Sequence, residues 1–341
     1  MDRRHFIGTA ALALLVGPAF AADPAPEAAA ALPPPPPAGA LPFIGEYGTP
    51  EDMLVVLERD QRLYAFRGEG EPVPLRRVSG TAFIGAGLGR IVFDGARQGR
   101  VTSVAVGGQR LARRDFGAEA QARIRAAVRA DPEARRAAAL AAQPPVETNR
   151  PRMFDLVPLA SVDPSIRFDI RYAGRDNFMG FALYERPGAW LQRPAAAALG
   201  RAAQSLKAKG YGLLVHDAYR PWFVTRMFWD ATPPEHRMFV ADPAQGSRHN
   251  RGAAVDVTLY DLATGKPVEM PGRYDEFSKR SYPGFRGGTT RQRWLRDLLR
   301  REMEQQGFTV YPEEWWHFDY RDWAKYPIGN VTFTELAEAP R

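Results

Sequence analysis

None of the 341 residues is a cysteine. This excludes disulfide bonds, iron–sulfur clusters, thiolate zinc sites and cysteine nucleophiles. With 45% hydrophobic and 25% charged residues, the chain has a globular composition, and its length suits one large domain or two smaller ones. Lys and Arg number 46 against 39 Asp and Glu, which gives a net charge of +7. No dense basic tract with interleaved aromatic residues accompanies this charge, so we interpret it as compositional bias and expect no nucleic-acid partner.

Residues 1–21 have the pattern of a cleavable signal peptide. A charged start precedes an apolar run at about residues 7–16, and Ala-Phe-Ala at 19–21 precedes the predicted cleavage site. Arg3-Arg4 resembles a twin-arginine signal, whose route exports folded proteins; a general secretory signal is the alternative. The run is too short for a permanent membrane span, and no later segment has 18 apolar residues. We therefore expect an exported protein, periplasmic or extracellular, that is not an integral membrane protein after cleavage.

Composition divides the remainder into four segments. Residues 22–42 are rich in Ala and Pro, which predicts an extended spacer. Residues 43–116 carry short β-rich runs between glycine turns, which predict a small all-β module: a meander, a sandwich or a half-barrel. Residues 117–150 are helix formers interrupted at Pro132, which predicts a linker of two short helices or one kinked helix. Residues 151–341 mix strand and helix patterns, so we expect an α+β domain rather than a doubly wound parallel sheet.

Hydrophobic periodicity and the secondary-structure propensities of the residues predict the individual strands and helices. In the β module, strands are predicted at 53–57, 62–66, 90–93 and 101–106. In the α+β domain, strands are predicted at 167–172, 212–216, 253–259 and 315–318, and helices at 193–209 and 292–306.

The 5 histidines include His5, which lies in the predicted signal peptide, and that leaves His216, His236, His249 and His317 for imidazole chemistry. Two histidines, an aspartate and a nearby glutamate are the parts of a hydrolytic zinc site with a fourth position open to water. Zinc lowers the pKa of bound water to about 7, and a carboxylate that is not a ligand can take its proton. Each part is weak when taken singly, and we interpret His216 and His236 as structural.

The candidate pair His249 and Asp256 constrains the local backbone. A separation of seven residues would place the two side chains on opposite faces of one strand. His249 is therefore predicted to lie in the loop before the strand, with Gly252 making the bend.

Five motifs follow one another along residues 151–330. They are Tyr172 with Asp176-Asn177-Phe178, Asp217-Ala218-Tyr219-Arg220-Pro221, Ser247-x-His249-x6-Asp256, Tyr274-Asp275 with Arg280-Ser281, and Glu314-Trp315-Trp316-His317. This ordered set resembles the D-alanyl-D-alanine dipeptidases of the VanX type. The resemblance implies a mainly antiparallel sheet flanked by helices, a fold shared with D,D-carboxypeptidases and the hedgehog signalling domain. It does not extend to the β module.

The resemblance also implies the metal site and the catalytic base. His249, Asp256 and His317 match the ligands of one zinc ion per chain. Glu314 matches the catalytic base, because the family's glutamate lies three residues before the histidine, which excludes neighbouring Glu313.

Four further residues match groups that handle the substrate. Arg220 matches the arginine that steadies the tetrahedral intermediate, Asp275 and Tyr172 match groups that hold the dipeptide's free ammonium, and Ser247 matches a substrate-contacting serine. The structural alternatives are an ion pair between Arg220 and Asp217, helix capping by Asp275, and a core position for Tyr172.

The implied activity is zinc-dependent hydrolysis of D-Ala-D-Ala or similar D,D-dipeptides. An exported enzyme would meet dipeptides or peptidoglycan fragments outside the cytoplasm, so wall turnover or dipeptide recycling is the expected role. One alternative is a D,D- or L,D-carboxypeptidase on muropeptide stems, which would not need Asp275 where an N-terminal amine sits. The other is a non-catalytic, zinc-folded module that binds cell-wall fragments, against which Glu314 and Arg220 argue.

Overall fold

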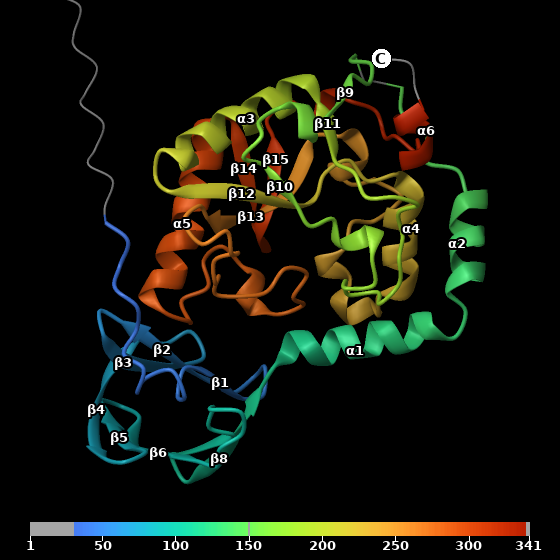
Figure 1. Ribbon diagram of the computed structural model, residues 1–341. Coiled ribbons are helices and arrows are strands. Elements are labelled where there is room, and N and C mark those ends of the chain that lie inside the picture. The colour runs from blue at the N-terminus through green and yellow to red at the C-terminus, as the bar shows by residue number, and fades with distance from the viewer. Residues whose placement is uncertain (1–30, 149–150, 339–341) are drawn as a thin grey trace, which may run out of the picture. The chain divides into compact units, whose positions relative to one another are not determined.

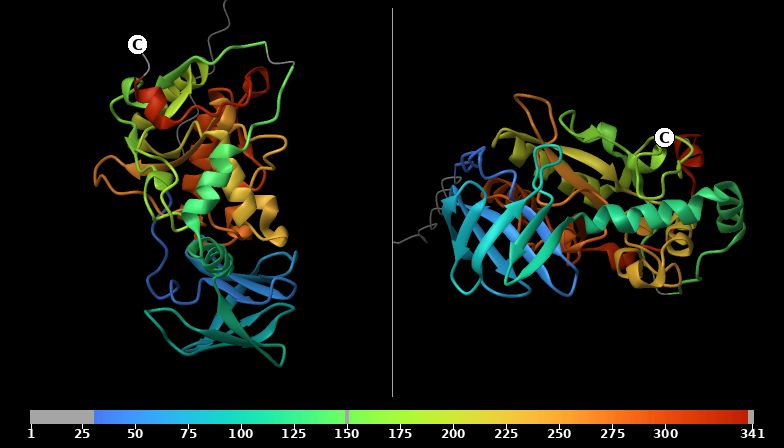
Figure 2. Two further views of the ribbon diagram at one scale, coloured as in Figure 1. Left: turned by 90° about the vertical axis from the view of Figure 1, so that its right-hand side faces the viewer. Right: turned by 90° about the horizontal axis from the view of Figure 1, so that it is seen from below.

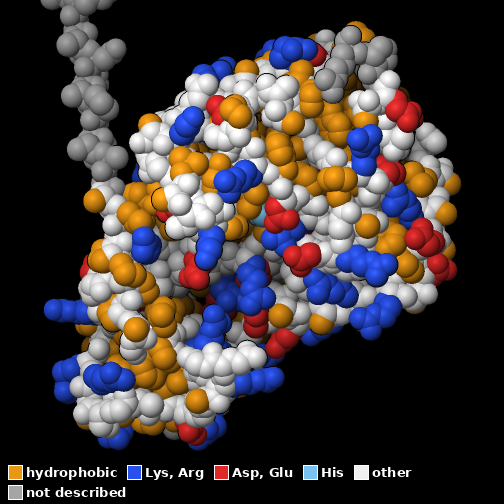
Figure 3. All heavy atoms as spheres, viewed as in Figure 1, with side chains coloured by type: hydrophobic (Ala, Val, Ile, Leu, Met, Phe, Trp, Pro, Cys, Tyr) orange, Lys and Arg blue, Asp and Glu red, His pale blue; other side chains and the backbone are white. Residues whose placement is uncertain are grey.

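The computed structural model describes residues 31–148 and 151–338 (Figure 1). The predicted signal peptide, residues 1–21, lies outside this described part. Within the described part, no helix has the length and apolarity needed to cross a bilayer. Acidic and basic side chains are interspersed over the face shown in Figure 3.

The first strands form a closed antiparallel barrel of eight strands (Figure 2). They are β1 (Gly45–Gly48), β2 (Met53–Arg59), β3 (Arg62–Arg67), β4 (Val73–Ser79), β5 (Ala82–Gly85), β6 (Gly89–Asp94), β7 (Ser103–Val106) and β8 (Gln109–Arg114). Closure comes from β1 pairing with β8, where Glu46 lies opposite Arg114. The barrel interior is aromatic: Phe43, Phe83 and Phe93 pack together with ring centroids 4.8 to 5.6 Å apart.

The predicted strands of this module are present as β2, β3, β6 and β7. The sequence-based prediction missed β1, β4, β5 and β8, and it expected at most half a barrel. The missed strands are short or rich in glycine and arginine, so their alternation is weak. A closed barrel tolerates such strands because their polar side chains face solvent while hydrogen bonding fixes the backbone.

Two helices follow, α1 (Phe116–Arg129) and α2 (Pro132–Ala141). Asp115 and Asp131 cap them by accepting hydrogen bonds from backbone amides three residues ahead. Pro132 occupies the first turn of α2, where its missing N–H costs nothing, so the interruption produces two helices rather than a kink. The apolar side of α1, with Ile124 at its centre, is buried in an aromatic cluster that includes Tyr172 and Phe178.

The α+β domain is built on a five-stranded sheet with the order β10-β12-β13-β15-β14. The strands are β10 (Arg167–Phe168), β12 (Tyr211–Asp217), β13 (Ala254–Asp261), β14 (Phe308–Tyr311) and β15 (Glu314–Tyr320). Every neighbouring pair is antiparallel except β10 and β12, which are parallel. Strands and helices are therefore mixed as predicted.

Helices α3 (Arg193–Lys207) and α5 (Thr290–Gln305) pack against this sheet. Leu199, Leu213, Val257 and Leu299 are fully buried in the cluster between them. The other regular elements are α4 (Trp222–Ala231), α6 (Phe333–Glu338), the pair β9 (Leu156–Pro158) and β11 (Trp190–Gln192), and the 3₁₀ turns η1 (Leu159–Ser161), η2 (Arg171–Ala173), η3 (Pro234–Phe239), η4 (His249–Arg251), η5 (Lys279–Ser281) and η6 (Trp323–Lys325).

One predicted element in this domain is shorter than expected. The strand predicted over 167–172 ends at Phe168 as β10, and Tyr172 lies in the 3₁₀ turn η2. The alternation of Arg167-Phe168-Asp169-Ile170 does not distinguish a strand from an extended entry into a turn.

The barrel contacts α5 through a buried carboxylate. Glu58 of β2 is fully buried, and its Oε2 accepts a hydrogen bond from the backbone N–H of Thr290 at 2.8 Å. In return, the Arg293 guanidinium donates to the Glu58 carbonyl at 2.8 Å. A negative charge at a helix N-terminus is stabilised by the exposed amides and the helix dipole. The described residues from Leu32 onward form one compact unit.

Candidate active site

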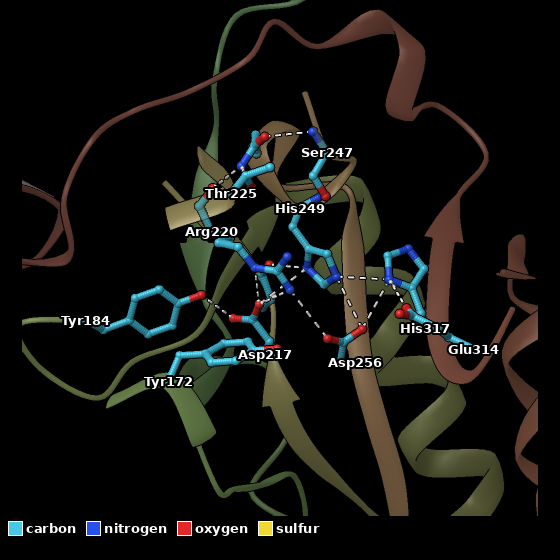
Figure 4. Close-up of polar contacts among 12 residues, drawn as sticks. Tyr172, Tyr184, Asp217, Arg220, Thr225, Ser247, His249, Asp256, Glu314 and His317 are labelled. Carbon is cyan, nitrogen blue, oxygen red and sulfur yellow. Dashed lines mark hydrogen bonds and ion pairs between the residues drawn. The ribbon is translucent and has the colours of Figure 1, made fainter. Parts of the chain in front are cut away.

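Three side chains from two strands and one turn converge on a common point (Figure 4). Asp256 on β13 lies directly opposite His317 on β15 in the sheet register, and His249 belongs to η4 just before β13. Asp256 Oδ1 is 3.2 Å from His249 Nε2 and 3.2 Å from His317 Nδ1, and the two nitrogens are 3.0 Å apart. All three residues are buried.

The donor set fits a tetrahedral zinc ion. Ligands 2.0–2.1 Å from zinc in a tetrahedron lie about 3.3–3.4 Å apart, close to the separations found here. Asp256 Oδ1 is buried and has no hydrogen-bond partner among the described residues. Burial alone would raise the pKa of Asp256, but the facing imidazoles hold it well below its usual range. An ionised, unpartnered oxygen between two imidazole nitrogens is suited to a divalent cation.

The outward nitrogens of both imidazoles are held by acceptors. His249 Nδ1 lies 2.6 Å from the Ala218 carbonyl, and His317 Nε2 lies 2.9 Å from Asp319 Oδ1. An acceptor beside each outer nitrogen favours the tautomer that carries its proton there, which would leave His249 Nε2 and His317 Nδ1 with lone pairs for a metal ion. Sequence reasoning missed Asp319, although its spacing of two from His317 on one strand face was a usable signal.

The backbone at His249 has the predicted form. His249 lies in the turn before β13, and Gly252 adopts the left-handed conformation with φ of 62°. This left-handed angle favours glycine, and a Cβ at Gly252 would also displace the Leu156 side chain, whose Cδ2 would lie 2.4 Å away.

Glu314 lies at the start of β15 beside the three ligand atoms. Its Oε2 is 3.5 Å from His317 Nδ1, and it lines the same cavity, of 350 Å³. Burial raises the pKa of Glu314 to about 7. A carboxyl group with a pKa near neutrality can both accept and return a proton during one turnover.

Arg220 is held at the edge of the centre. Its Nε donates to Asp217 Oδ2 at 2.8 Å, and its Nη2 lies 2.8 Å from the same oxygen and 3.7 Å from Asp256 Oδ2. Asp217 is itself fixed by the Tyr184 hydroxyl at 2.6 Å. The ion pair considered as the structural alternative is therefore present, and Arg220 nevertheless lines the cavity. Sequence reasoning gave Tyr184 no role.

Asp275 and Tyr172 meet on another wall of the cavity. The Tyr172 hydroxyl donates to Asp275 Oδ1 at 2.9 Å, and both residues line the cavity. Asp275 caps no helix, because the N-cap of the following η5 is Ser278. Burial raises the pKa of Asp275 well above its usual range, so this carboxyl group would gain from an opposite charge.

Neighbouring side chains connect these groups. The Tyr274 hydroxyl donates to Asp256 Oδ2 at 2.9 Å, which reasoning from sequence did not anticipate. His216 stacks on Tyr274 with ring centroids 4.6 Å apart, a packing contact in line with its structural interpretation. Ser247 is buried in the cavity wall, where its hydroxyl accepts from the His249 N–H at 3.2 Å.

Comparisons with known proteins agree with this arrangement. The D-ala-D-ala dipeptidase family, peptidase M15, matches residues 152–335. The D-alanyl-D-alanine dipeptidase of Escherichia coli (strain K12) is 34% identical over 177 residues, which is 51% of this chain and 89% of that protein. That of Enterococcus faecium is 34% identical over 186 residues, 49% of this chain and 92% of that protein. That of Streptomyces coelicolor is 34% identical over 175 residues, 46% of this chain and 87% of that protein.

Proposed function

The chain belongs to the D-ala-D-ala dipeptidase family of zinc metallopeptidases, and we propose that it hydrolyses D-alanyl-D-alanine at one zinc ion held by His249, Asp256 and His317. The observation that carries the proposal is the convergence of three buried ligand atoms beside the Glu314 carboxyl group, whose Oε2 lies 3.5 Å from His317 Nδ1. When bound there, zinc supplies Lewis-acid chemistry and lowers the pKa of water.

Side chains of the protein transfer the protons and stabilise the charged groups of the substrate. Glu314 takes a proton from the attacking water at its carboxylate and delivers it to the leaving amine. Arg220 stays protonated, and the donors that Asp217 leaves free stabilise the developing oxyanion. Asp275 takes the substrate's ammonium, and the Tyr172 hydroxyl orients that carboxylate. Ser247, which also lines the cavity, contacts the bound dipeptide.

We also propose that the sheet with α3 and α5 shares the hedgehog and D,D-carboxypeptidase fold. Its antiparallel pairs and flanking helices support this assignment.

The substrate proposal predicts a strict requirement for a free amine. N-acetyl-D-alanyl-D-alanine should be cleaved with a kcat/KM about 10²- to 10³-fold lower than the free dipeptide, because it leaves the half-buried Asp275 without its counter-ion. Release of D-alanine by the zinc-loaded protein measures both reactions, with D-Ala-D-Ala-D-Ala as a longer substrate. Preference for the acylated or longer substrate would favour the carboxypeptidase alternative. Binding to cell-wall fragments without any cleavage would favour the non-catalytic module.

We propose that the protein acts outside the cytoplasm on dipeptides or peptidoglycan fragments, in wall turnover or recycling. The signal pattern of residues 1–21, with Arg3-Arg4, supports export by the twin-arginine route. Fractionation of cells that produce the full chain should find a shortened protein outside the cytoplasm. Replacing Arg3 and Arg4 together with Lys should retain it inside, and unchanged export of that variant would contradict the route.

A further inference from the structure

Helix α1 lies outside the family match, yet it contacts both loops that carry the amine-binding groups. The match begins at residue 152, whereas α1 spans Phe116–Arg129. Its buried side chains Ala120 and Ile124 belong to the same aromatic cluster as Tyr172 and Phe277. The helix is therefore part of the wall behind the cavity.

The first contact reaches the backbone of Asp275. Gln121 Nε2 donates to the Asp275 carbonyl oxygen at 2.8 Å. Asp275 has a positive φ of 57°, a left-handed conformation that is costly for a residue with a side chain. The hydrogen bond from Gln121 holds that conformation, which directs the carboxylate toward the Tyr172 hydroxyl.

The second contact reaches the loop that carries Tyr172. The Arg125 guanidinium, one turn after Gln121, donates to the Asn177 carbonyl at 2.6 Å. The Asn177 side chain in turn donates to the carbonyls of Arg171, Gly174 and Phe181 at 2.8 to 3.2 Å. Arg125 thus fixes Asn177, whose side-chain hydrogen bonds stabilise the loop around Tyr172.

A third contact holds the far end of the Asp275 loop. Asp115, the N-cap of α1, accepts from the Arg280 guanidinium at 2.7 Å. Arg280 also donates to the buried Glu276 carboxylate at 2.5 Å. A Cβ at Gly117 would lie 2.2 Å from Glu276 Cγ, so the helix and this loop are in close contact.

We propose that Gln121 and Arg125 are positioning residues for the amine-binding wall, so that α1, which lies outside the residues matched by the family, contributes to the selectivity for a free N-terminal ammonium. This rests on the proposed dipeptidase function. The hydrogen bonds from Gln121 and Arg125 keep Asp275 and Tyr172 at hydrogen-bond distance from each other. Loss of either hydrogen bond lets the two side chains move apart. The effect appears in substrate binding and selectivity, because neither residue contacts the metal ligands or Glu314.

The test uses the full, zinc-loaded chain with Gln121→Met, which keeps length but removes the donor. We expect kcat/KM for D-alanyl-D-alanine to fall about 3- to 10-fold through KM, as the loss of one hydrogen bond implies. The preference for the free over the N-acetylated dipeptide should fall by a similar factor. Arg125→Lys, which keeps the charge but shortens the reach, should shift KM and preference the same way. Arg129→Ala, at an exposed position of α1, is the matched control and should change neither value.

Folding and function are separated by two further measurements. Zinc content and melting temperature show whether each variant is folded. If Gln121→Met does not fold, the kinetics of Arg125→Lys test the positioning role. Calorimetric titration of D-alanyl-D-alanine into Glu314→Gln, with and without Gln121→Met, measures binding without turnover and should show the same 3- to 10-fold loss. An inactive wild-type protein refutes the proposed function. An active wild-type protein with unchanged KM, affinity and preference in the folded variants refutes the positioning role.

Discussion

Glu314→Gln is expected to lower kcat on D-alanyl-D-alanine by about 10²- to 10⁴-fold, the usual contribution of a general acid–base group. The amide has the size of the carboxylate but cannot take a proton from water. Glu314 lies 3.5 Å from His317 Nδ1 and is not needed to complete the ligand set, so zinc binding should persist. Release of D-alanine and the zinc content of the purified variant are the two measurements.

Glu313→Gln is the matched control, because it makes the same change in the neighbouring residue, which does not line the cavity. Its kcat should stay within about twofold of the wild type, as is usual for a substitution away from the site. If Glu314→Gln retains activity, or if Glu313→Gln loses it, the catalytic base has been misassigned.

Removal of zinc is expected to abolish hydrolysis, and addition of zinc should restore it. Asp256 Oδ1 makes no hydrogen bond among the described residues and lies 3.2 Å from both imidazole nitrogens, so the three ligand atoms remain together for zinc to return to. Asp319→Ala should weaken zinc affinity by about 10- to 100-fold, since Asp319 holds the His317 ring through Nε2. Competition with a chromophoric chelator measures this affinity.

His236→Gln is the control for the metal experiments. It changes a histidine outside the ligand set, so zinc affinity should equal that of the wild type. Full activity of the thoroughly stripped protein would overturn the metal assignment. Equal affinity in Asp319→Ala would show that the imidazole orientation does not depend on this carboxylate.

The candidate site could be predicted largely because its residues lie in short local motifs. The spacing of His249 and Asp256 placed His249 in the loop before the strand, with the bend predicted at Gly252, and the structure has that bend. Contacts between residues that are far apart in the sequence leave no such local motif. The contact between Gln121 and Asp275 joins residues 154 positions apart, and no periodicity in the sequence predicts it.

The fold class could be predicted from the sequence, but the closure of the first eight strands into a barrel could not. Strands with clear alternation, such as β2 and β3, were identified, whereas β1 and β8 are recognisable mainly by the hydrogen bonds they make to each other. Tyr172 shows the same limit on a smaller scale, because its turn is held by Asn177 and not by its own neighbours. Such elements are stabilised by tertiary contacts, which override weak local preference.

The carboxylate of Glu58 at the start of α5 bears on how this protein can be cut or recombined. A fragment trimmed to the family match, residues 152–335, would leave the Thr290 amide without that acceptor and the aromatic wall behind Tyr172 without Ile124. Protein engineers who transplant the catalytic half into another scaffold must therefore carry the N-terminal half with it, or supply substitutes for both contacts.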